Sequence, residues 1–257
     1  MNKFCFIFNE GNVLLKVADD GECTIPENPK DKGLPHPESE IIEVNCGVLN
    51  LKVMAYRTKD TATGSDYKWV GLRQSYYKLS PSIYQIAGKC AELLYWDAHT
   101  QYCGTCGHKM IWHSPISKQC THCQKQIWPS PAPAIIVLIH RGKEVLLVHA
   151  KNFRGDFFGL VAGFVETGEN LEEAVIREVK EETGLSIKNL RYFGSQPWPY
   201  PFGLMLGFNA DYDSGELHLQ YEELEKGSWF QKDDMPTIPE KLSIARKLID
   251  AWLAEEV

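Results

Sequence analysis

The chain has 257 residues, a formal net charge of −7 at pH 7, and 44% hydrophobic and 11% aromatic residues. This composition is typical of a globular protein with a sizeable core and two or three domains, and it excludes disordered and fibrous proteins. The negative charge argues against a broad electrostatic surface for nucleic acid, although a local basic groove remains compatible with it.

The apolar stretches are too short for a membrane span or a signal peptide. A span needs roughly 18 consecutive apolar residues, and the apolar run at residues 4–8 is shorter than the core of a signal peptide. We therefore expect a cytoplasmic protein with no membrane partner. In that setting the eight cysteines are expected to be reduced thiols, some of which bind a metal.

Residues 1–97 are predicted to form a small mixed N-terminal domain of short strands and loops that ends in a helix. Apolar runs such as FCFIF and VLLKV alternate with breaks rich in Pro, Gly and Asp. The helix is predicted from a cap at Ser80, a proline at position 81 and apolar residues at helical spacing up to Leu94. We expect a packing or dimerisation module here rather than a separate active site.

Residues 98–130 contain two CxxC pairs, which are typical of a zinc ribbon. Four thiolates at this spacing match the tetrahedral ligand set of zinc and close the site to substrate, so the zinc is predicted to be structural. The ligands are Cys103, Cys106, Cys120 and Cys123. A nucleic-acid-binding ribbon is an alternative, but Lys109, Lys118 and Lys125 are few for a phosphate-binding surface. The other cysteines, Cys5, Cys23, Cys46 and Cys90, are predicted to be buried apolar residues.

Residues 131–257 are predicted to form a third, mixed domain. Two apolar runs around Arg141–Glu144 indicate a hairpin, and the segment from residue 190 to 217 alternates strand-like runs with turns. A helix over residues 171–183 follows from Asn170 and Glu173 as a cap and Gly184 as a stop. The last fifteen residues, SIARKLIDAWLAEEV, indicate an amphipathic helix.

The helix over residues 171–183 combines an apolar stripe with crowded glutamates. At 100° per residue Leu171, Val175 and Val179 share one face, and the edge of that face holds Glu178, Glu181 and Glu182. A solvated surface explains Glu172 and Glu173 but not these three, because like charges at i and i+4 repel, more so when partly desolvated. A hard divalent cation removes that penalty. Arg177 is expected to contact Glu173 or Glu181.

The segment from Gly163 to Leu185 resembles the Nudix box in full: G, x5, E, x7, then REVKEETGL. The resemblance implies an α/β/α sandwich and a hydrolase that cleaves a diphosphate with Mg²⁺ or Mn²⁺. It implies metal binding by Glu178 and Glu182, a further ligand or support in Glu181, and a backbone ligand at Ala162. Glu169 and Arg177 resemble the pair that stabilises the box loop, within a frame that starts at Gly163 and closes at Gly184.

A further carboxylate is expected outside the box. The spacing from Glu223 to Trp229 resembles the E, x5, W segment of the family, which makes Glu223 the predicted extra ligand or base and Glu222 the reserve. An acidic surface loop is the alternative, since loops are commonly charged.

The segment SQPWPYPFG, residues 195–203, resembles the signature of the NudC-type NADH pyrophosphatases within the Nudix hydrolases. It departs from that signature at Tyr200 and at Gly203, where the pattern has serine. The resemblance implies substrate contacts from Gln196, Pro197, Trp198, Pro199, Tyr200, Pro201, Phe202 and Gly203, and by position from Phe164, Trp128, Ala245 and Arg73. It also implies a homodimer, with residues of both subunits near the pocket.

The sequence therefore predicts a metal-dependent hydrolase with a Nudix sandwich preceded by a zinc ribbon and a mixed domain. The expected reaction cuts NADH or NAD⁺ into nicotinamide mononucleotide and AMP, and the same cut would remove an NAD cap from an RNA 5′ end. Hydrolysis of ADP-ribose or another nucleoside diphosphate derivative is the alternative. A zinc-ribbon RNA-binding regulator with a silent Nudix fold is a third reading, which the complete set of Glu178, Glu181 and Glu182 disfavours.

Overall fold

The computed structural model describes residues 4–47, 51–61, 63–153 and 155–256. The chain divides into two compact units, one made of Met1–Ser130 with Pro199–Phe202 and the other of Pro131–Trp198 with Gly203–Val257. We call them unit 1 and unit 2. No helix among the described residues has the length and apolar character needed to cross a membrane.

Unit 2 is built on one sheet with the strand order β13-β14-β10-β11-β15. Strand β12 pairs with residues 134–137 of β10, and β11 pairs with β10 at residues 140 and 141. The central strand β10 is parallel to β14 and antiparallel to β11 and β12. The strands are β10 (Ala132–Arg141), β11 (Glu144–Ala150), β12 (Val161–Phe164), β13 (Ser186–Trp198), β14 (Gly203–Ser214) and β15 (Leu224–Gln231). The hairpin predicted around Arg141–Glu144 is confirmed as β10 and β11.

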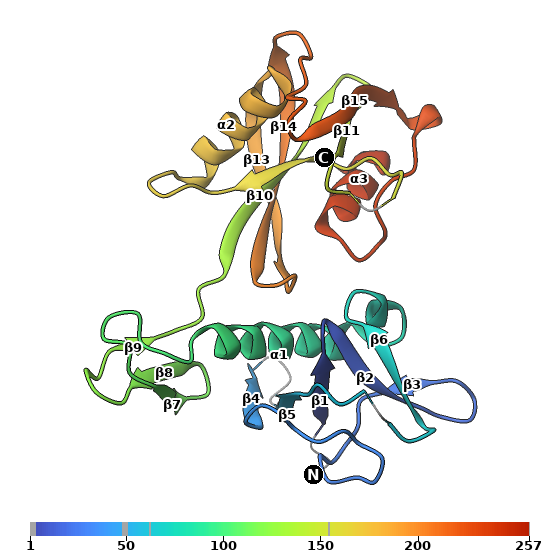
Figure 1. Cartoon of the computed structure of the whole chain (residues 1–257). Coiled ribbons are helices and arrows are strands. Elements are labelled where there is room, and N and C mark those ends of the chain that lie inside the picture. Colours follow the sequence, from blue (N-terminus) through green and yellow to red (C-terminus); the bar gives the residue numbers. More distant parts are fainter. Residues whose placement is uncertain (1–3, 48–50, 62, 154, 257) are drawn as a thin grey trace. The chain divides into compact units, whose positions relative to one another are not determined.

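Two helices cover the opposite faces of this sheet, as Figure 1 shows: α2 (Leu171–Thr183) and α3 (Ile244–Leu253). Successive residues of a strand point to opposite faces, so β10 serves two cores. Ile135 and Val137 pack in the core with α2, whereas Ile136 and Leu138 pack in the core with α3. The predicted α/β/α sandwich is therefore confirmed for unit 2, and so is the closing helix.

Unit 1 contains a second mixed sheet with the order β3-β2-β1-β5-β4, in which β6 pairs with β2. Its elements are β1 (Cys5–Asn9), β2 (Asn12–Val17), β3 (Cys23–Thr24), β4 (Ile42–Cys46), β5 (Leu51–Arg57), β6 (Tyr67–Gly71), a short 3-10 helix (Gln74–Tyr77) and α1 (Pro81–His99). The helix α1 begins as predicted, with Ser80 accepting a hydrogen bond from the N–H of Ile83. It ends at His99, two residues beyond the predicted domain boundary at residue 97.

The four cysteines outside the ribbon were all expected to be buried. Cys5, Cys46 and Cys90 are buried, and burial raises the pKa of the Cys5 thiol to about 12. The expectation was wrong for Cys23, which is only half-buried because it lies on the two-residue edge strand β3.

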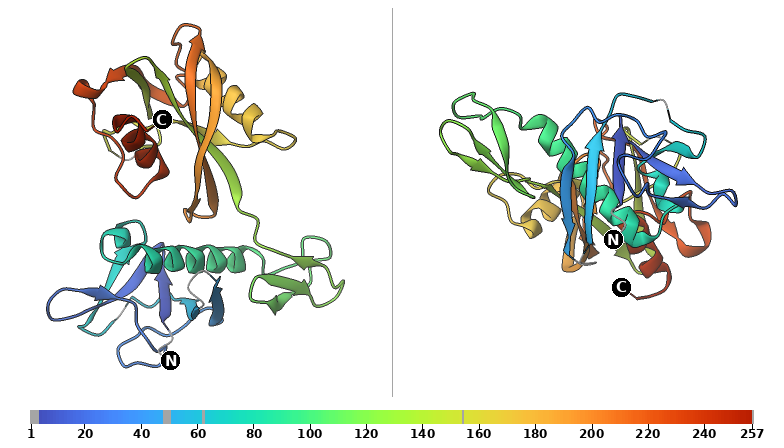
Figure 2. Two further views of the ribbon diagram at one scale, coloured as in Figure 1. Left: turned by 180° about the vertical axis from the view of Figure 1, so that it is seen from behind. Right: turned by 90° about the horizontal axis from the view of Figure 1, so that it is seen from below.

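The ribbon is a separate three-stranded sheet, β7 (Met110–Ser114), β8 (Ser117–Cys120) and β9 (Gln126–Ile127), beyond the C-terminal end of α1 (Figures 1 and 2). Lys118 of β8 joins it to the helix. Its Nζ lies 2.7 Å from a carboxylate oxygen of Asp97 and donates to the carbonyl oxygens of Asp97 and Thr100. The ammonium also lies over the rings of Trp96 and Trp112. Lys118 is 1% exposed, so it is a structural residue and not part of a phosphate-binding surface.

Replacing Lys118 by methionine should destabilise unit 1 by about 3 kcal/mol, because it leaves the buried Asp97 carboxylate without its closest cation. Urea unfolding followed by tryptophan fluorescence measures this change. The exposed pair of Lys52 and Glu43 is the matched control: Lys52→Met should change the free energy of unfolding by less than about 1 kcal/mol. Equal effects of the two substitutions would contradict the role of the Lys118 contact.

Candidate active site

The helix α2 is fixed at both ends by local hydrogen bonds. Asn170 Oδ1 accepts from the N–H of Glu173 at 2.8 Å, and a Glu173 carboxylate oxygen accepts from the N–H of Asn170 at 2.9 Å, which completes a capping box. Gly184 ends the helix with φ of 72°, in the left-handed region that favours glycine. The predicted bounds of this helix are confirmed.

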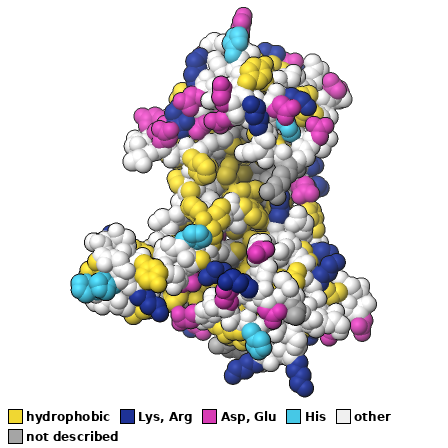
Figure 3. Space-filling model, viewed as in Figure 1, with side chains coloured by type: hydrophobic (Ala, Val, Ile, Leu, Met, Phe, Trp, Pro, Cys, Tyr) yellow, Lys and Arg dark blue, Asp and Glu magenta, His cyan; other side chains and the backbone are white. Residues whose placement is uncertain are grey.

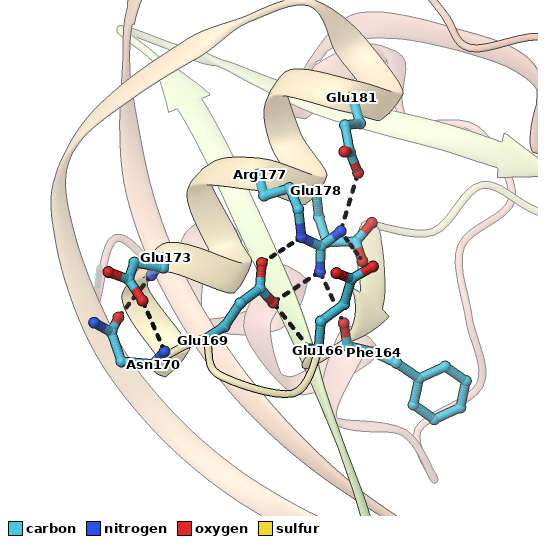
Figure 4. A network of polar contacts seen from close by, with 8 residues as sticks. All are labelled: Phe164, Glu166, Glu169, Asn170, Glu173, Arg177, Glu178 and Glu181. Atoms are coloured by element: carbon cyan, nitrogen blue, oxygen red, sulfur yellow. Dashed lines mark hydrogen bonds and ion pairs between the residues drawn. The ribbon is translucent and has the colours of Figure 1, made fainter.

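Arg177 spreads its guanidinium over three carboxylates, as Figure 4 shows. It donates to both oxygens of Glu169, at 2.5 and 3.0 Å, and one terminal nitrogen donates to Glu178 at 2.9 Å and to Glu181 at 3.0 Å. The other donates to the carbonyl oxygen of Phe164. The expected contact with Glu181 is present. The alternative contact with Glu173 was wrong, because Glu173 belongs to the capping box.

Glu169 is held from two sides. Besides the Arg177 fork it accepts a hydrogen bond from the N–H of Glu166 at 2.9 Å. The fork holds the pKa of the Glu169 carboxyl below its usual range. The structure thus joins the loop before α2 to the middle of the helix through Glu169 and Arg177.

Glu178 and Glu182 turn their carboxyl groups toward the interior, with 9% and 3% of each residue exposed. The Glu178 carboxyl lies against the backbone of Gly163, where a Cβ atom would come within 2.0 Å of it. Only glycine leaves that space on β12. Burial raises the pKa of Glu178, although Arg177 opposes the shift. Burial, with the charges of Glu178, Glu223 and Glu181 added, raises the pKa of Glu182 to about 8.

Glu223 lies in a turn fastened to the C-terminal end of α2. The N–H of His218 donates to the carbonyl oxygen of Thr183, and the N–H of Gln220 donates to the carbonyl oxygen of Glu182. The N–H of Lys151 donates to the carbonyl oxygen of Glu223. The charge of Glu223 contributes to the raised pKa of both Glu178 and Glu182, whereas Glu222 contributes to neither. This electrostatic coupling agrees with the choice of Glu223 over the reserve Glu222, which stays a prediction.

These carboxylates fit a divalent cation by chemistry more than by a closed cage. Four acidic side chains influence one another electrostatically, and two of them are buried. They form a site rich in carboxylate oxygens and in negative charge, which Mg²⁺ and Mn²⁺ prefer. Within the described part of the chain, only groups of cysteine and histidine bring three ligand atoms within 4.8 Å of one another. Ala162, the predicted backbone ligand, lies on β12 next to Gly163 and opposite Ile136 of β10.

Two of the predicted substrate contacts lie in a single row across the sheet. Phe164 of β12 faces Ala134 of β10, Ala134 faces Met205 of β14, and Met205 faces Gln196 of β13. Phe164 is 66% exposed. Gln196 donates from Nε2 to the carbonyl oxygen of Leu242 at 2.9 Å, while its Oε1 is buried with no hydrogen-bond partner.

The row lies on the α3 side of the sheet, where Met205 packs with the buried Ala245 at the start of α3. Gly163 faces α2 and Phe164, one residue further, shares the face of Ala162 and the α3 core. The carboxylates and the row therefore lie on opposite faces of the sheet and adjoin consecutive residues, Gly163 and Phe164, at the end of β12. The positions of Pro197 and Trp198 continue β13 beyond Gln196, and Gly203 begins β14.

The middle of the predicted substrate segment belongs to unit 1. Pro199 packs against Gly88 of α1, the Tyr200 hydroxyl lies 2.5 Å from that of Tyr84, and the ring of Phe202 stacks on Tyr95. Pro201 lies in the same turn. Arg73 precedes the 3-10 helix of unit 1. Burial raises the pKa of the Tyr84 and Tyr200 hydroxyls, and the charge of Arg73 opposes that rise. Trp128, 52% exposed, follows β9.

The four cysteines of the CxxC pairs converge. Their sulfur atoms all lie within 4.8 Å of one another, with Cys103 and Cys123 at 3.7 Å and Cys106 and Cys120 at 3.4 Å. The N–H groups of Thr105 and His122 point at the sulfurs of Cys103 and Cys120, and such donors favour thiolates. This arrangement of four sulfur atoms could hold a metal ion in a closed site.

Comparison with known proteins agrees with this geometry. The model of the NUDIX domain matches residues 130–253, and that of the "NADH pyrophosphatase-like rudimentary NUDIX domain" matches residues 2–96. The chain is 43% identical to the "NAD-capped RNA hydrolase NudC" of Pseudomonas syringae pv. syringae (strain B728a) over 188 residues, 73% of this chain and 68% of that protein. It belongs to the NudC family of NUDIX hydrolases.

Other relatives extend the family resemblance. The NudC protein of Mannheimia succiniciproducens is 53% identical over 127 residues, which cover 47% of this chain and 48% of that protein. Among solved structures, a NUDIX hydrolase from Nitrosomonas europaea aligns with a TM-score of 0.52 and 20% identity over 60% of this chain and 91% of that chain. That likeness shows the fold alone. Family membership makes the chain an enzyme, and the third reading, a silent regulator, is set aside.

Sequence reasoning missed several residues that shape the site. Met205 completes the row between Phe164 and Gln196, and only the strand register reveals it. Tyr84 contacts Tyr200 across 116 positions of the chain, and no local pattern marks that contact. The sequence analysis named Gly163 only as the start of the box, and its close approach to the Glu178 carboxyl was not predicted, although a glycine permits such an approach.

The raised pKa of Glu182 predicts that metal binding stabilises the folded protein to an extent that depends on pH. Since the folded value of about 8 lies above the ordinary 4.5, the stability linked to the protonated carboxyl is fully present below about pH 4.5 and is lost as the pH rises through about 8. We expect Mn²⁺ to raise the melting temperature more at pH 8 than at pH 5. Differential scanning fluorimetry measures both shifts, and Glu182→Gln should weaken the pH dependence. Equal shifts at the two pH values would contradict it.

Proposed function

We propose that the protein hydrolyses the pyrophosphate bond of NADH or NAD⁺ to nicotinamide mononucleotide and AMP, with Mg²⁺ or Mn²⁺ at the Nudix box. The observation that carries the proposal is that two consecutive residues at the end of β12 adjoin the two groups: Gly163 lies against the Glu178 carboxyl, and Phe164 begins the row that ends at Gln196. The relatives named above support it, since each is a NAD-capped RNA hydrolase by name.

The carboxylates divide the work by their exposure. Glu178 and Glu182, both buried, would hold the divalent cations together with Glu223 and the Ala162 carbonyl, and bound cations would supply charge to the phosphate oxygens and polarise a water. Arg177 keeps Glu178 and Glu181 in place from the outer side. Glu181 is exposed to solvent and would accept the proton of the attacking water.

The row on the α3 side would hold a ring of the dinucleotide. The exposed ring of Phe164 offers a stacking surface, and the buried Oε1 of Gln196 offers an acceptor to an amide or amino group. An unpartnered buried acceptor is costly, so a ligand that donates to it gains affinity. Nicotinamide and adenine both carry such a donor.

The same bond occurs at the 5′ end of an RNA that begins with NAD, and its cleavage would leave a 5′ monophosphate. We propose NAD-capped RNA as a second substrate of the same site. The activity named for the NudC relatives supports this extension.

The substrate assignment predicts a higher kcat/KM for NADH than for ADP-ribose, because ADP-ribose lacks the nicotinamide ring that the row would hold. Steady-state rates on NADH, NAD⁺ and ADP-ribose with Mn²⁺ test this. A kcat/KM for ADP-ribose tenfold or more above that for NADH, about 1.4 kcal/mol in transition-state binding, would sink it. Glu182→Gln is the control and should lose activity on all three substrates.

We propose that the four-cysteine site holds one structural zinc ion per chain and that the enzyme acts as a homodimer. The closed set of thiolates supports the zinc. Elemental analysis of the purified protein is expected to give one zinc per chain, and Cys106→Ser should lower both the zinc content and the melting temperature. Light scattering tests the dimer, and a monomeric mass at working concentration would refute it.

A further inference from the structure

Acidic side chains are missing from a long stretch of this acidic chain. From residue 98 to residue 143 there is no Asp and no Glu, although the whole chain has 34. The same stretch contains five Lys or Arg residues and five histidines. The ribbon lies entirely within it. The ribbon is thus a local exception to the net charge of −7.

Two of the three lysines of the ribbon, Lys109 and Lys125, lie at the end where its two CxxC turns meet, whereas Lys118 is buried against α1. Lys125 Nζ donates to Thr105 Oγ1 at 2.9 Å, which links the second turn to the first. The N–H and hydroxyl of Thr121 both donate to the carbonyl oxygen of Lys109 at 3.0 Å. The rings of His108 and His122 stack with centroids 4.2 Å apart and planes 11° apart.

An aromatic side chain completes this surface. Tyr102 pairs with Lys109 in an isolated β-bridge and is 72% exposed. We call the set Tyr102, His108, Lys109, His122 and Lys125 the knuckle surface, and all five residues are exposed. In the space-filling view the ribbon, at lower left, displays histidine, basic and hydrophobic side chains (Figure 3).

The ammonium groups of the knuckle surface are free of competing carboxylates in the ribbon's own sequence. Within the ribbon, the four cysteines, when they bind a metal as thiolates, are the one source of negative charge. Zinc would neutralise half of that charge, and the N–H groups of Thr105 and His122 point at two of the sulfurs. The surface is therefore suited to weak, salt-sensitive contacts rather than to a tight anion site.

We infer that the knuckle surface binds the single-stranded body of an RNA substrate. Lys109 and Lys125 would contact phosphates, and the ring of Tyr102 and the stacked imidazoles would offer faces to unpaired bases. These contacts do not read sequence, so the surface would raise affinity for RNA in general. The inference rests on the proposed hydrolysis of NAD-capped RNA and extends it to the part of the RNA beyond the cap.

The test separates RNA binding from catalysis. Fluorescence anisotropy with a 5′-monophosphate single-stranded RNA measures the Kd of the full-length enzyme and of the double variant Lys109→Gln, Lys125→Gln. We expect the Kd to rise about fivefold or more, and the slope of log Kd against log salt to fall by about 1.4, which is about 0.7 for each lost phosphate contact. Tyr102→Ala should weaken binding without changing that slope.

Three controls locate the effect. Thr105→Val removes the hydrogen bond to Lys125 but keeps the charge, so it should bind RNA like the unaltered protein. Lys68→Gln removes an exposed lysine of β6 in unit 1 and should also leave binding unchanged. Zinc content must be equal in all variants. A polyglutamate competitor that displaces the RNA as well as an unlabelled RNA does would show a charge effect only and overturn the inference.

Activity measurements keep this inference apart from the proposed function. The double variant should hydrolyse NADH at the normal rate, while its KM for NAD-capped RNA rises and its kcat does not. Normal RNA binding and a normal KM in the double variant would refute the knuckle surface but leave NADH hydrolysis intact. Absence of NADH and cap hydrolysis in the unaltered enzyme would instead refute the proposed function.

Discussion

The mutual repulsion of carboxylates on one buried helix edge is the constraint on which the site depends. Glu178 and Glu182 are one turn apart and both are shielded from water. Ionisation of either carboxyl therefore costs free energy unless a cation lies nearby. Arg177 offsets part of this charge from the outer side while it fastens the loop before α2. The negative charge that Arg177 does not offset favours the binding of divalent cations at this site. An ordinary solvated helix would have no such requirement.

Local patterns were sufficient to predict the parts of the fold that short-range forces determine. The helix α2 begins at its asparagine cap and ends at Gly184 as expected, because caps act within four residues. The convergence of the four cysteines followed from their CxxC spacing, whereas the sandwich was expected from the resemblance to the Nudix box. The contacts of Arg177 were only half predicted, since helical spacing offered both Glu173 and Glu181 as partners and the capping box decided between them.

The long-range parts of the site were out of reach of such reasoning. The row from Phe164 to Gln196 depends on the register of four strands, which no single segment specifies. The segment from residue 196 to 203 reads as one motif, yet its middle packs with α1 in unit 1 while Gln196 bonds to Leu242 in unit 2. The burial of Lys118 was also not predictable, because its partner Asp97 lies on a different element.

The alternation along β12 carries one more consequence. Gly163 faces the glutamates and Phe164 faces the opposite side of the sheet. Whether a residue of β12 faces the carboxylates or the row therefore depends on its odd or even position along the strand. Inserting or deleting a single residue in this strand would exchange the two faces and place a bulky ring where only a hydrogen atom fits. Two-residue changes would preserve the parity. Sequence drift in this strand is therefore limited to substitutions and even-numbered length changes.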